Sequence, residues 1–304
     1  MNENEKKATK RSLEEEKRVL KKLKLLYLAA LLELKEGIRD YTSDDEWSAN
    51  VYQNSYQILL AQQISDVLDK LRSKEYETIK DYLEDSYTDG FVGSVFSMHG
   101  QDVPIIVPMD KEQIIRALTT NSKIKEGLYE ALGVDVDKLK QAIADEIARG
   151  IATNMSYGEI ARNISERMNI SLRKARRIVI TEAHRIREEA AQDARSAAKT
   201  QGADVVKQWD ATMDGKTRKT HRKLDGQVRE INEPFEVDGK KAMHPGGFGL
   251  PEEDINCRCV ALTRARWAMN EAELEILKQR AEFWGLDKTK DFEEFRRRFL
   301  DAVK

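Results

Sequence analysis

Hydrophobic positions recur at helical spacing through the first third of the chain. Leucine and tyrosine side chains return every three or four positions after a highly charged opening, so we expect the first helix to begin near Ser12. Ser43 and Glu46 have the spacing of a capping box, which predicts the start of a second helix. Residues 74–96 form a third helical segment. We therefore predict a helical arm or bundle over residues 1–108.

The segment Asp102–Pro108, with the sequence DVPIIVP, interrupts this pattern. Its β-branched residues lie between prolines, which is typical of a crossing segment or an edge strand. Helical spacing resumes near Asp110 and continues over about Val136–Thr153. A short helix after Ser156 then precedes a long helix that has no internal glycine or proline and covers residues 171–200.

After Gly202 the pattern changes to short apolar stretches separated by loops that contain glycine and proline. ADVVKQWDAT, GQVREI and CRCVALT each predict a strand. Between the first two, Asp214 suits the N-cap and Gly226 the C′ position of a short helix. Two terminal helices follow from about Asn270. The predicted class is α+β and mainly α-helical, with a small β-rich region near the C-terminus.

Three domains follow from these elements. Residues 1–108 form the helical arm, and a partner protein is expected to bind there. Residues 109–268 combine helices with the β-rich region, and residues 269–304 form the C-terminal helices.

Composition limits the classes of function. Charged residues make up 35% of the chain and its net charge is −2, so nucleic acid would have to bind a local basic patch. The longest apolar run, Leu25–Leu32, is far shorter than the roughly 20 residues of a membrane-spanning helix. Two cysteines one residue apart do not form a disulfide framework, and no secretory signal opens the chain. We expect a protein of a reducing cytoplasm with no membrane partner.

The rare metal-binding residue types gather in one region: His221, His244, Cys257 and Cys259. Thiolates and imidazoles are ligands that suit Zn²⁺, and a structural zinc ion is one interpretation of this group. Side chains two apart on a regular strand lie about 6.6 Å apart, so the CRC backbone would have to bend for both sulfurs to bind one ion. The alternative is that the histidines form hydrogen bonds and the thiols pack as small apolar groups.

Two further groups have both a functional and a structural interpretation. Asp214, Arg218 and His221 are candidates for an active triad or an anion site, but a capped helix whose arginine pairs with an acid such as Glu182 explains them more simply.

The basic cluster of the long helix is a candidate for contact with DNA phosphates. It consists of Arg173, Lys174, Arg176 and Arg177. Acidic residues follow on the same helix, so a solvated face of mixed charge is the favoured interpretation.

Taken in order, the motifs from Ala152 to Thr263 resemble those of the head-morphogenesis or minor head proteins of tailed bacteriophages, the phage Mu F-like family. The shared features are a helix with a Thr-Glu pair, a strand with a tryptophan, an Asp-x-x-x-Arg-x-x-His turn, a Leu-Asp-Gly and a closing Asn-Cys-Arg-Cys. In this chain they are Thr181, Glu182, Trp209, Asp214, Arg218, His221, Leu224, Asp225, Gly226, Asn256, Cys257, Arg258 and Cys259.

The resemblance implies a minor capsid protein of a phage or prophage. Such a protein would enter the prohead by contact with the portal protein, lie inside the virion head near the portal, and act in packaging or ejection of genomic double-stranded DNA. During assembly it would reside in the host cytoplasm.

Two enzymatic functions are alternatives to this assembly role. A metal-dependent nuclease needs a general base beside an open metal position, and a closed site of two histidines and two cysteines leaves none. An ADP-ribosyltransferase-like toxin domain would carry a Ser-Thr-Ser strand, which occurs nowhere in the chain. We therefore predict no catalytic residues.

Overall fold

The fold is described from a computed structural model. It describes residues 1–42, 50–110, 112–113, 116–117, 128–152, 155, 157–266, 279, 281–289 and 291–302, with the helix residues 38–42, 50–60, 128–134, 150–152 and 157 described by their backbone alone.

The chain forms two compact units that interleave along the sequence. The bundle unit consists of residues 17–81 and 126–179, and the mixed unit of residues 1–16, 82–125 and 180–304. Each unit is described by itself. The three contiguous domains predicted from the sequence, residues 1–108, 109–268 and 269–304, remain predictions. Each of the two compact units combines stretches that are separate in the sequence.

The first helix, α1 (Glu3–Thr42), begins nine residues before the predicted start at Ser12. Asn2 explains the early start: its Oδ1 accepts a hydrogen bond from the Glu5 N–H at 2.8 Å, and Glu5 Oε2 accepts one from the Asn2 N–H at 2.6 Å. This reciprocal cap satisfies two amide groups that would otherwise lack partners at a helix start.

The second and third predicted helices are one continuous helix, α2 (Asn50–His99). The predicted capping box at Ser43 and Glu46 lies outside the described residues. Gly90 lies within the helix, where a Cβ atom would come within 2.3 Å of the Arg187 carbonyl oxygen. The glycine therefore allows two helix backbones to approach closely, and it does not interrupt the helix.

The short helix and the long helix expected after Ser156 are likewise one element, α5 (Tyr157–Thr200). Ser156 itself is outside the described residues, as is most of the stretch predicted to be helical after Asp110. The helix predicted at about residue 136 is α4 (Leu128–Ala152).

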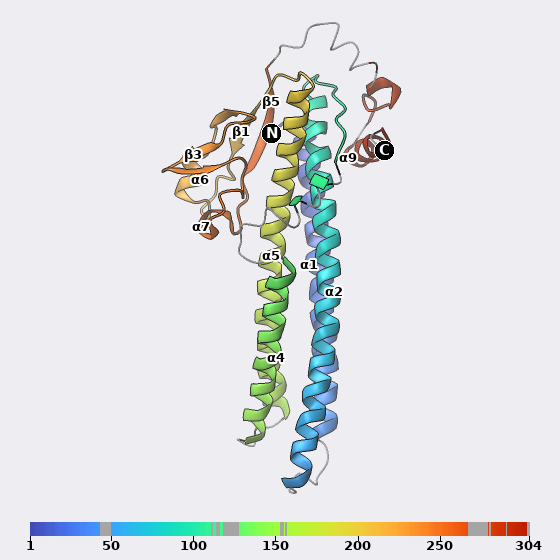
Figure 1. Ribbon diagram of the computed structural model, residues 1–304, viewed down its shortest axis with the longest axis vertical. Helices are drawn as coiled ribbons and strands as arrows, with labels where there is room; N and C mark the ends of the chain where they lie inside the picture. Colours follow the sequence, from blue (N-terminus) through green and yellow to red (C-terminus); the bar gives the residue numbers. More distant parts are fainter. Residues whose placement is uncertain are drawn as a thin grey trace. The chain divides into compact units, whose positions relative to one another are not determined.

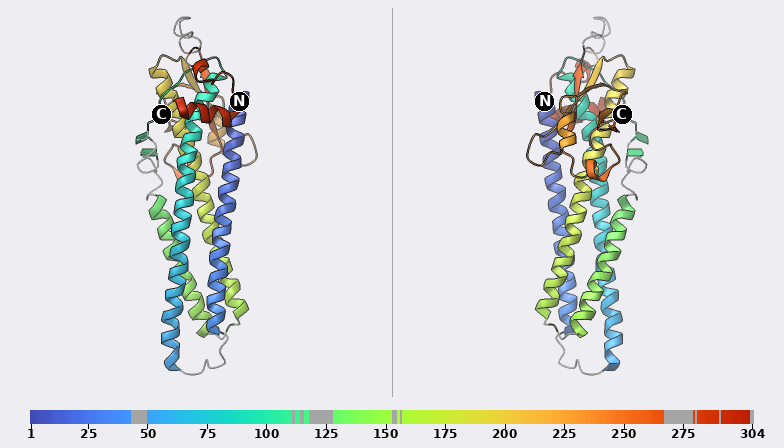
Figure 2. Two further views of the ribbon diagram at one scale, coloured as in Figure 1. Left: turned by 90° about the vertical axis from the view of Figure 1, so that its right-hand side faces the viewer. Right: turned by 90° about the vertical axis from the view of Figure 1, so that its left-hand side faces the viewer.

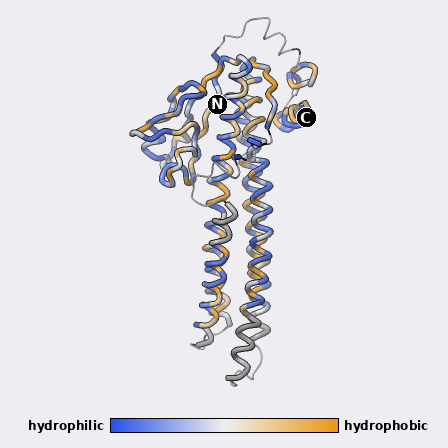
Figure 3. Tube along the Cα trace, viewed as in Figure 1, coloured by the Kyte–Doolittle hydropathy of each residue, from blue (hydrophilic) through white to orange (hydrophobic). Residues whose placement is uncertain are grey.

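The bundle unit consists of parts of α1, α2, α4 and α5, which run side by side (Figure 2). Hydrophobic and hydrophilic positions alternate along the helices, as amphipathic helices require (Figure 3). A cluster of buried apolar side chains forms the core of this unit: Tyr27, Ala30, Leu34, Ile64, Val67, Leu68, Leu71, Val136, Leu139, Ile143, Ile147, Ile160, Ile164, Met168 and Ala175.

The segment Val103–Pro108 crosses the mixed unit without forming a helix or joining a described strand. Val103, Ile105 and Val107 are buried. The alternative of a crossing segment is therefore correct for these residues, and the alternative of an edge strand is wrong.

The β-rich part of the mixed unit, residues 203–266, is here called the β-module. An antiparallel sheet has the order β2-β1-β5, formed by Val228–Glu230, Val205–Asp210 and Val260–Ala265. All three predicted strands are confirmed, although β5 begins after the cysteines. The module packs on α5, where Glu188 accepts the Ala261 N–H at 2.9 Å (Figure 1).

The β-module also contains a hairpin that the sequence analysis missed, β3 (Phe235–Val237) and β4 (Lys240–Ala242). Its turn residues Asp238 and Gly239 both have positive φ, 49° and 75°. Asp-Gly is the preferred pair for such a tight hairpin turn, so the signal was present in the sequence. Two short helices, α6 (Lys219–Leu224) and α7 (Pro251–Asp254), complete the module.

The last predicted helix is confirmed as α9 (Phe292–Ala302). Its three phenylalanines are buried, and Phe295 lies 4.7 Å from Phe96 between ring centroids. The helix predicted from Asn270 falls mostly outside the described residues. The fold is thus mainly α-helical with small antiparallel sheets, as predicted. Among the described helices none is long and apolar enough to span a membrane.

Candidate metal centre

Helix α6 presents His221 to the interior of the β-module. Its N-cap is Arg218, whose side chain makes no capping bond, so the prediction of Asp214 as the N-cap is wrong. Asp214 instead accepts the Lys216 N–H at 2.8 Å in the preceding turn. The prediction of Gly226 at C′ is confirmed: its φ is 77° and its N–H donates to the Trp209 carbonyl at 2.8 Å.

The loop before the cysteines is fixed by Asp254. Its carboxylate accepts three successive backbone N–H groups, from Phe248, Gly249 and Leu250, at 3.1, 2.6 and 3.1 Å. Asn256 follows with a φ of 55°, and the cysteines therefore lie on a bent segment ahead of β5. The two sulfurs lie within 4.8 Å of each other, closer than the spacing on a regular strand, as a shared ion would require.

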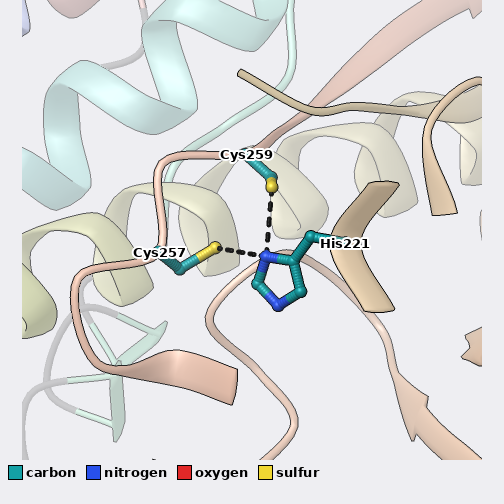
Figure 4. A group of neighbouring side chains, drawn as sticks. All are labelled: His221, Cys257 and Cys259. Atoms are coloured by element: carbon teal, nitrogen blue, oxygen red, sulfur yellow. Dashed lines mark hydrogen bonds between the residues drawn. The ribbon is translucent and has the colours of Figure 1, made fainter. Parts of the chain in front are cut away.

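Three of the four predicted ligands converge. His221 Nδ1 lies 3.3 Å from Cys259 Sγ and 3.7 Å from Cys257 Sγ, and all three ligand atoms lie within 4.8 Å of one another (Figure 4). Zinc–sulfur and zinc–nitrogen bonds of about 2.3 and 2.0 Å in tetrahedral geometry place nitrogen and sulfur about 3.6 Å apart. The group therefore has the donor types and the spacing of a zinc site.

The structure does not bring His244 into this group. His244 is buried and its Nδ1–H donates to the Pro245 carbonyl at 3.0 Å. Desolvation by burial lowers the pKa of His244 to about 4. Within the described part of the chain no fourth His, Cys, Asp or Glu joins the other three.

The prediction of no catalytic residues depended on a closed site of four protein ligands, and only three of the four converge. His221, Cys257 and Cys259 are each no more than 3% exposed. A catalytic metal must admit its substrate, whereas a structural ion need not.

Glu253 is a further residue of the site that was not predicted from the sequence. Its Oε2 lies 3.2 Å from His221 Nε2, whereas the sulfurs lie beside Nδ1 of the same ring. Thr220 and Lys240 donate to the two carboxylate oxygens at 2.8 and 2.7 Å. Burial by itself would raise the pKa of Glu253, but these hydrogen bonds outweigh it and lower the pKa. No sequence pattern marks this residue, because its partners come from α6 and β4.

Aromatic rings and the paired thiols shape the rest of the site. Trp209 is fully buried on β1 and meets the His221 ring edge-on at 5.7 Å between centroids. The pKa of Cys259 is lowered to about 5, chiefly because Cys257 hydrogen-bonds to its sulfur and His221 lies beside it. The pKa of Cys257 is raised. Both cysteines are free, so no disulfide joins them.

The other residues of the predicted motif, including Asp225, Glu182 and Arg218, form hydrogen bonds that hold parts of the fold together. Asp225 accepts the Ala211 N–H at 2.8 Å and thereby joins α6 to the end of β1. Glu182 accepts the Arg185 guanidinium at 3.0 Å, whereas Arg218 donates to the Ile255 carbonyl. The expected pairing of Arg218 with Glu182 is therefore wrong.

Asp214 lies at the surface and forms a two-point ion pair with Arg258, at 2.6 and 2.8 Å. The Arg258 guanidinium holds the pKa of that carboxyl well below its usual range. Since His221 is buried, Asp214, Arg218 and His221 do not converge as a triad.

The basic cluster of α5 is divided between two environments. Lys174 pairs with Asp135 at 2.7 Å. Arg173, Arg176 and Arg177 are exposed, and none of them forms an ion pair with another described residue.

Comparison with known proteins agrees with the motifs. Residues 141–262 match the family described as Phage Mu protein F like protein. The minor head protein GP7 of Bacillus phage SPP1 is 29% identical over 205 residues, which cover 65% of this chain and 66% of that protein. NAD(+)--arginine ADP-ribosyltransferase EFV of Enterococcus faecalis is 30% identical over 240 residues, which cover 78% of this chain and 49% of that protein. The alignments thus span about half of one relative and less than two thirds of the other, and no solved structure matches.

Proposed function

Because residues 141–262 match the phage Mu F-like family, we propose that the chain is a minor head protein of a tailed phage or prophage. The observation that carries the proposal is the family match over the β-module and the helices before it. The similarity to a protein named as a minor head protein supports the same role. The chain would act as a virion component and bind other parts of the head.

The proposed partner during assembly is the portal protein, with the prohead as the destination. The helices of the bundle unit offer long solvated faces suited to lie along a partner's surface. The test is co-expression of the full chain with the portal protein of the same phage, followed by size-exclusion chromatography. Co-elution is expected, with the portal of an unrelated phage as the control. Failure to associate with either portal or prohead would contradict this part.

Genomic DNA is a second proposed partner, in packaging or ejection. Three exposed arginines of α5 without acidic partners among the described residues, Arg173, Arg176 and Arg177, support this proposal. They lie within five positions of one helix and would neutralise phosphates without reading sequence.

Zinc is the proposed cofactor, in a structural role. His221, Cys257 and Cys259 supply one nitrogen and two sulfur donors, the soft set that selects zinc over Mg²⁺ or Ca²⁺. His221 Nε2, a buried polar atom without an aligned hydrogen-bond partner, lies near a carboxylate, as the second nitrogen of metal-binding histidines does. A bound ion would join α6 to the segment before β5.

An ADP-ribosyltransferase is the alternative that one relative's name raises. The aligned part covers 49% of that protein, so the named activity can reside in the remainder. This chain lacks the Ser-Thr-Ser strand, and its metal-binding group is buried. The direct test is an assay of NAD consumption and of nuclease activity on the purified chain. Turnover that His221→Ala abolishes would overturn the assembly role.

A further inference from the structure

We infer that Glu253 is the positioning residue of a metal centre formed by His221, Cys257 and Cys259. The inference rests on the zinc proposed above. It concerns which histidine nitrogen carries the proton and what keeps the imidazole directed at the two sulfurs.

The ring of His221 has two distinct sides. Nδ1 faces the sulfurs at 3.3 and 3.7 Å, and Nε2 faces Glu253 at 3.2 Å. A carboxylate beside Nε2 stabilises the tautomer that carries its proton there, which leaves the Nδ1 lone pair free to bind a cation. A histidine with the opposite tautomer would direct an N–H at the sulfurs and could not be a ligand.

Glu253 is itself held in place. Its side chain is 4% exposed, and its two oxygens are fixed by Thr220 and Lys240. Thr220 precedes His221 on α6, so the carboxylate is tied to the same helix that carries the ligand. The chain Lys240–Glu253–His221 thus connects the hairpin, α7 and α6 at one point.

Glu252 is a matched control. It is the preceding residue of α7, 61% exposed, and it reaches the same Lys240 at 3.5 Å without approaching His221. A substitution there removes the same charge from the same helix and leaves the histidine untouched.

The experiment measures the zinc affinity of the full chain by competition with a chromogenic chelator, for the parent, Glu253→Gln and Glu252→Gln. The absorption spectrum of the cobalt-loaded protein is recorded in parallel. Glu253→Gln is expected to lower the affinity by about 10- to 100-fold while the thiolate-to-cobalt absorption band persists, as is usual for loss of a residue that orients a metal ligand. Glu252→Gln is expected to retain the parent affinity.

Equal zinc affinities for Glu253→Gln and the parent would overturn the positioning role while leaving the metal site in place. A parent chain that binds neither zinc nor cobalt would overturn both. Should Glu253→Gln fail to fold, Thr220→Val keeps the carboxylate but removes one of its two anchors. It is expected to weaken zinc binding several-fold, and an unchanged affinity would contradict the role.

A different surface carries a second inference, independent of the metal. Leu25, Leu28 and Leu32 of α1 are 56%, 43% and 62% exposed, and Ala29 is exposed between them. The spacing of three, four and seven positions places all four on one side of the helix. Clustered exposed leucines of this kind mark an interaction site, whereas scattered ones do not.

Charges at the two ends of this leucine stripe indicate what covers it. Exposed Lys21 and Lys22 lie one turn before Leu25, and exposed Glu36 lies one turn after Leu32. A second copy of the helix running antiparallel places Leu25 against Leu32, Leu28 against Ala29 and Lys21 against Glu36. A parallel copy would place lysine against lysine. We propose that α1 pairs with α1 of a second copy of this chain in the antiparallel direction.

Sedimentation velocity of the full chain over a range of concentrations tests this pairing. Leu28→Glu is expected to raise the dimer dissociation constant at least tenfold, whereas Leu13→Glu, at another exposed leucine of α1, is expected to leave it unchanged. Lys21→Glu and Glu36→Lys should each weaken self-association, and an equimolar mixture of the two variants should restore it. A parent that stays monomeric at every concentration, or a mixture as weak as its components, would overturn the proposal.

Discussion

Glu253 and Asp254 are neighbours on α7 with different tasks. Asp254 accepts three backbone N–H groups and fixes the loop that precedes the cysteines. Glu253 faces the histidine that the cysteines also face. One loop, fixed by the Asp254 carboxylate, therefore places both thiols beside α6. This is why cysteine and histidine side chains gather in this part of the fold.

Substitutions at His221, His244 and one thiol distinguish the proposed metal ligands from their neighbours. We predict that Cys259→Ser or His221→Ala abolishes zinc binding and His244→Ala does not, because His244 is bonded to Pro245 and lies outside the converging group. A ligand at about 1,000 times its dissociation constant stabilises a fold by about 4 kcal/mol, so the loss should be visible in thermal unfolding.

The measurement is metal content by mass spectrometry together with the melting temperature, with and without a chelator. Loss of zinc on His244→Ala and its retention in Cys259→Ser would reverse the ligand assignment.

At the residue scale the sequence indicated donor types but could not indicate geometry. His221, Cys257 and Cys259 were predicted because few other residues have their chemistry. His244 has the same chemistry, and only the path of the loop separates it from the group. Glu253 was missed because acidic residues are common and nothing local distinguishes one that a distant histidine will approach.

Helix contacts in the mixed unit depend on one glycine. Gly90 of α2 lies against the α5 backbone, where a Cβ would come within 2.3 Å of the Arg187 carbonyl oxygen. We predict that Gly90→Ala lowers the free energy of unfolding by about 1–3 kcal/mol, because the helices must separate. The predicted fall is the net effect that remains after the roughly 1 kcal/mol that alanine gains over glycine in a helix.

Gly93→Ala is the control, since its Cβ would meet side chains alone, Ala8 at 3.3 Å and Phe292 at 4.0 Å. Chemical denaturation of both variants provides the comparison. A Gly90→Ala variant as stable as Gly93→Ala would contradict the close approach.

A buried polar chain links the four helices of the bundle unit. Tyr27 Oη lies 3.1 Å from Glu75 and 3.2 Å from Ser171, and Ser171 donates to Asp135. Burial, reinforced by the Asp135 charge, raises the pKa of Glu75 to about 7 despite the hydrogen bond from Tyr27.

This raised pKa predicts a pH-dependent stability. Between pH 4.5 and 7 the folded chain holds the Glu75 proton and the unfolded chain releases it, so the free energy of unfolding falls as pH rises. The shift corresponds to a loss on the order of 3 kcal/mol. Glu75→Gln should remove that part of the dependence, while Glu77→Gln, at an exposed position, should not. The free energy of unfolding is measured by urea denaturation across this pH range. Parallel profiles for Glu75→Gln and the parent would contradict the raised pKa of Glu75.

At the scale of elements, periodicity predicted where helices lie better than where they end. Helix α1 begins earlier than predicted because the Asn2 side chain caps it. Hydrophobic spacing carries no information about such a local hydrogen bond. Gly90 lies inside a helix, where sequence alone gives no reason for a glycine, but the packing of α5 against it requires one. Asp238 and Gly239 indicate the turn of the β3–β4 hairpin. The hairpin was not predicted because its strands are shorter than the apolar stretches that predicted the other strands.

For the whole molecule, DNA binding is predicted to depend on the α5 arginines. Replacing Arg173, Arg176 and Arg177 together by glutamine should weaken binding of random duplex DNA and reduce the salt dependence, since each phosphate contact contributes about 0.9 to the slope of log affinity against log salt. Arg167, which lies 3.7 Å from Glu146, is the control. Filter binding at two salt concentrations measures both effects, and an unchanged slope in the triple variant would contradict the proposed contact.

The role of the whole chain depends on motifs spread from the middle of α5 to β5. The sequence located them in the correct order, and the structure shows why the order matters: α5 supports the sheet, the sheet carries Trp209, and the final strand begins just after the thiols. What periodicity could not predict is the interleaving of the two units, because three long helices pass through both.

The most direct test of the account is the protein content of purified heads. Particles from an induced culture are separated on a density gradient, and the chain is quantified by mass spectrometry in proheads and filled heads. The account predicts that the chain co-sediments with both at a fixed ratio to the portal protein. Its confinement to the soluble fraction, with heads that assemble and fill without it, would contradict a role as a minor head protein.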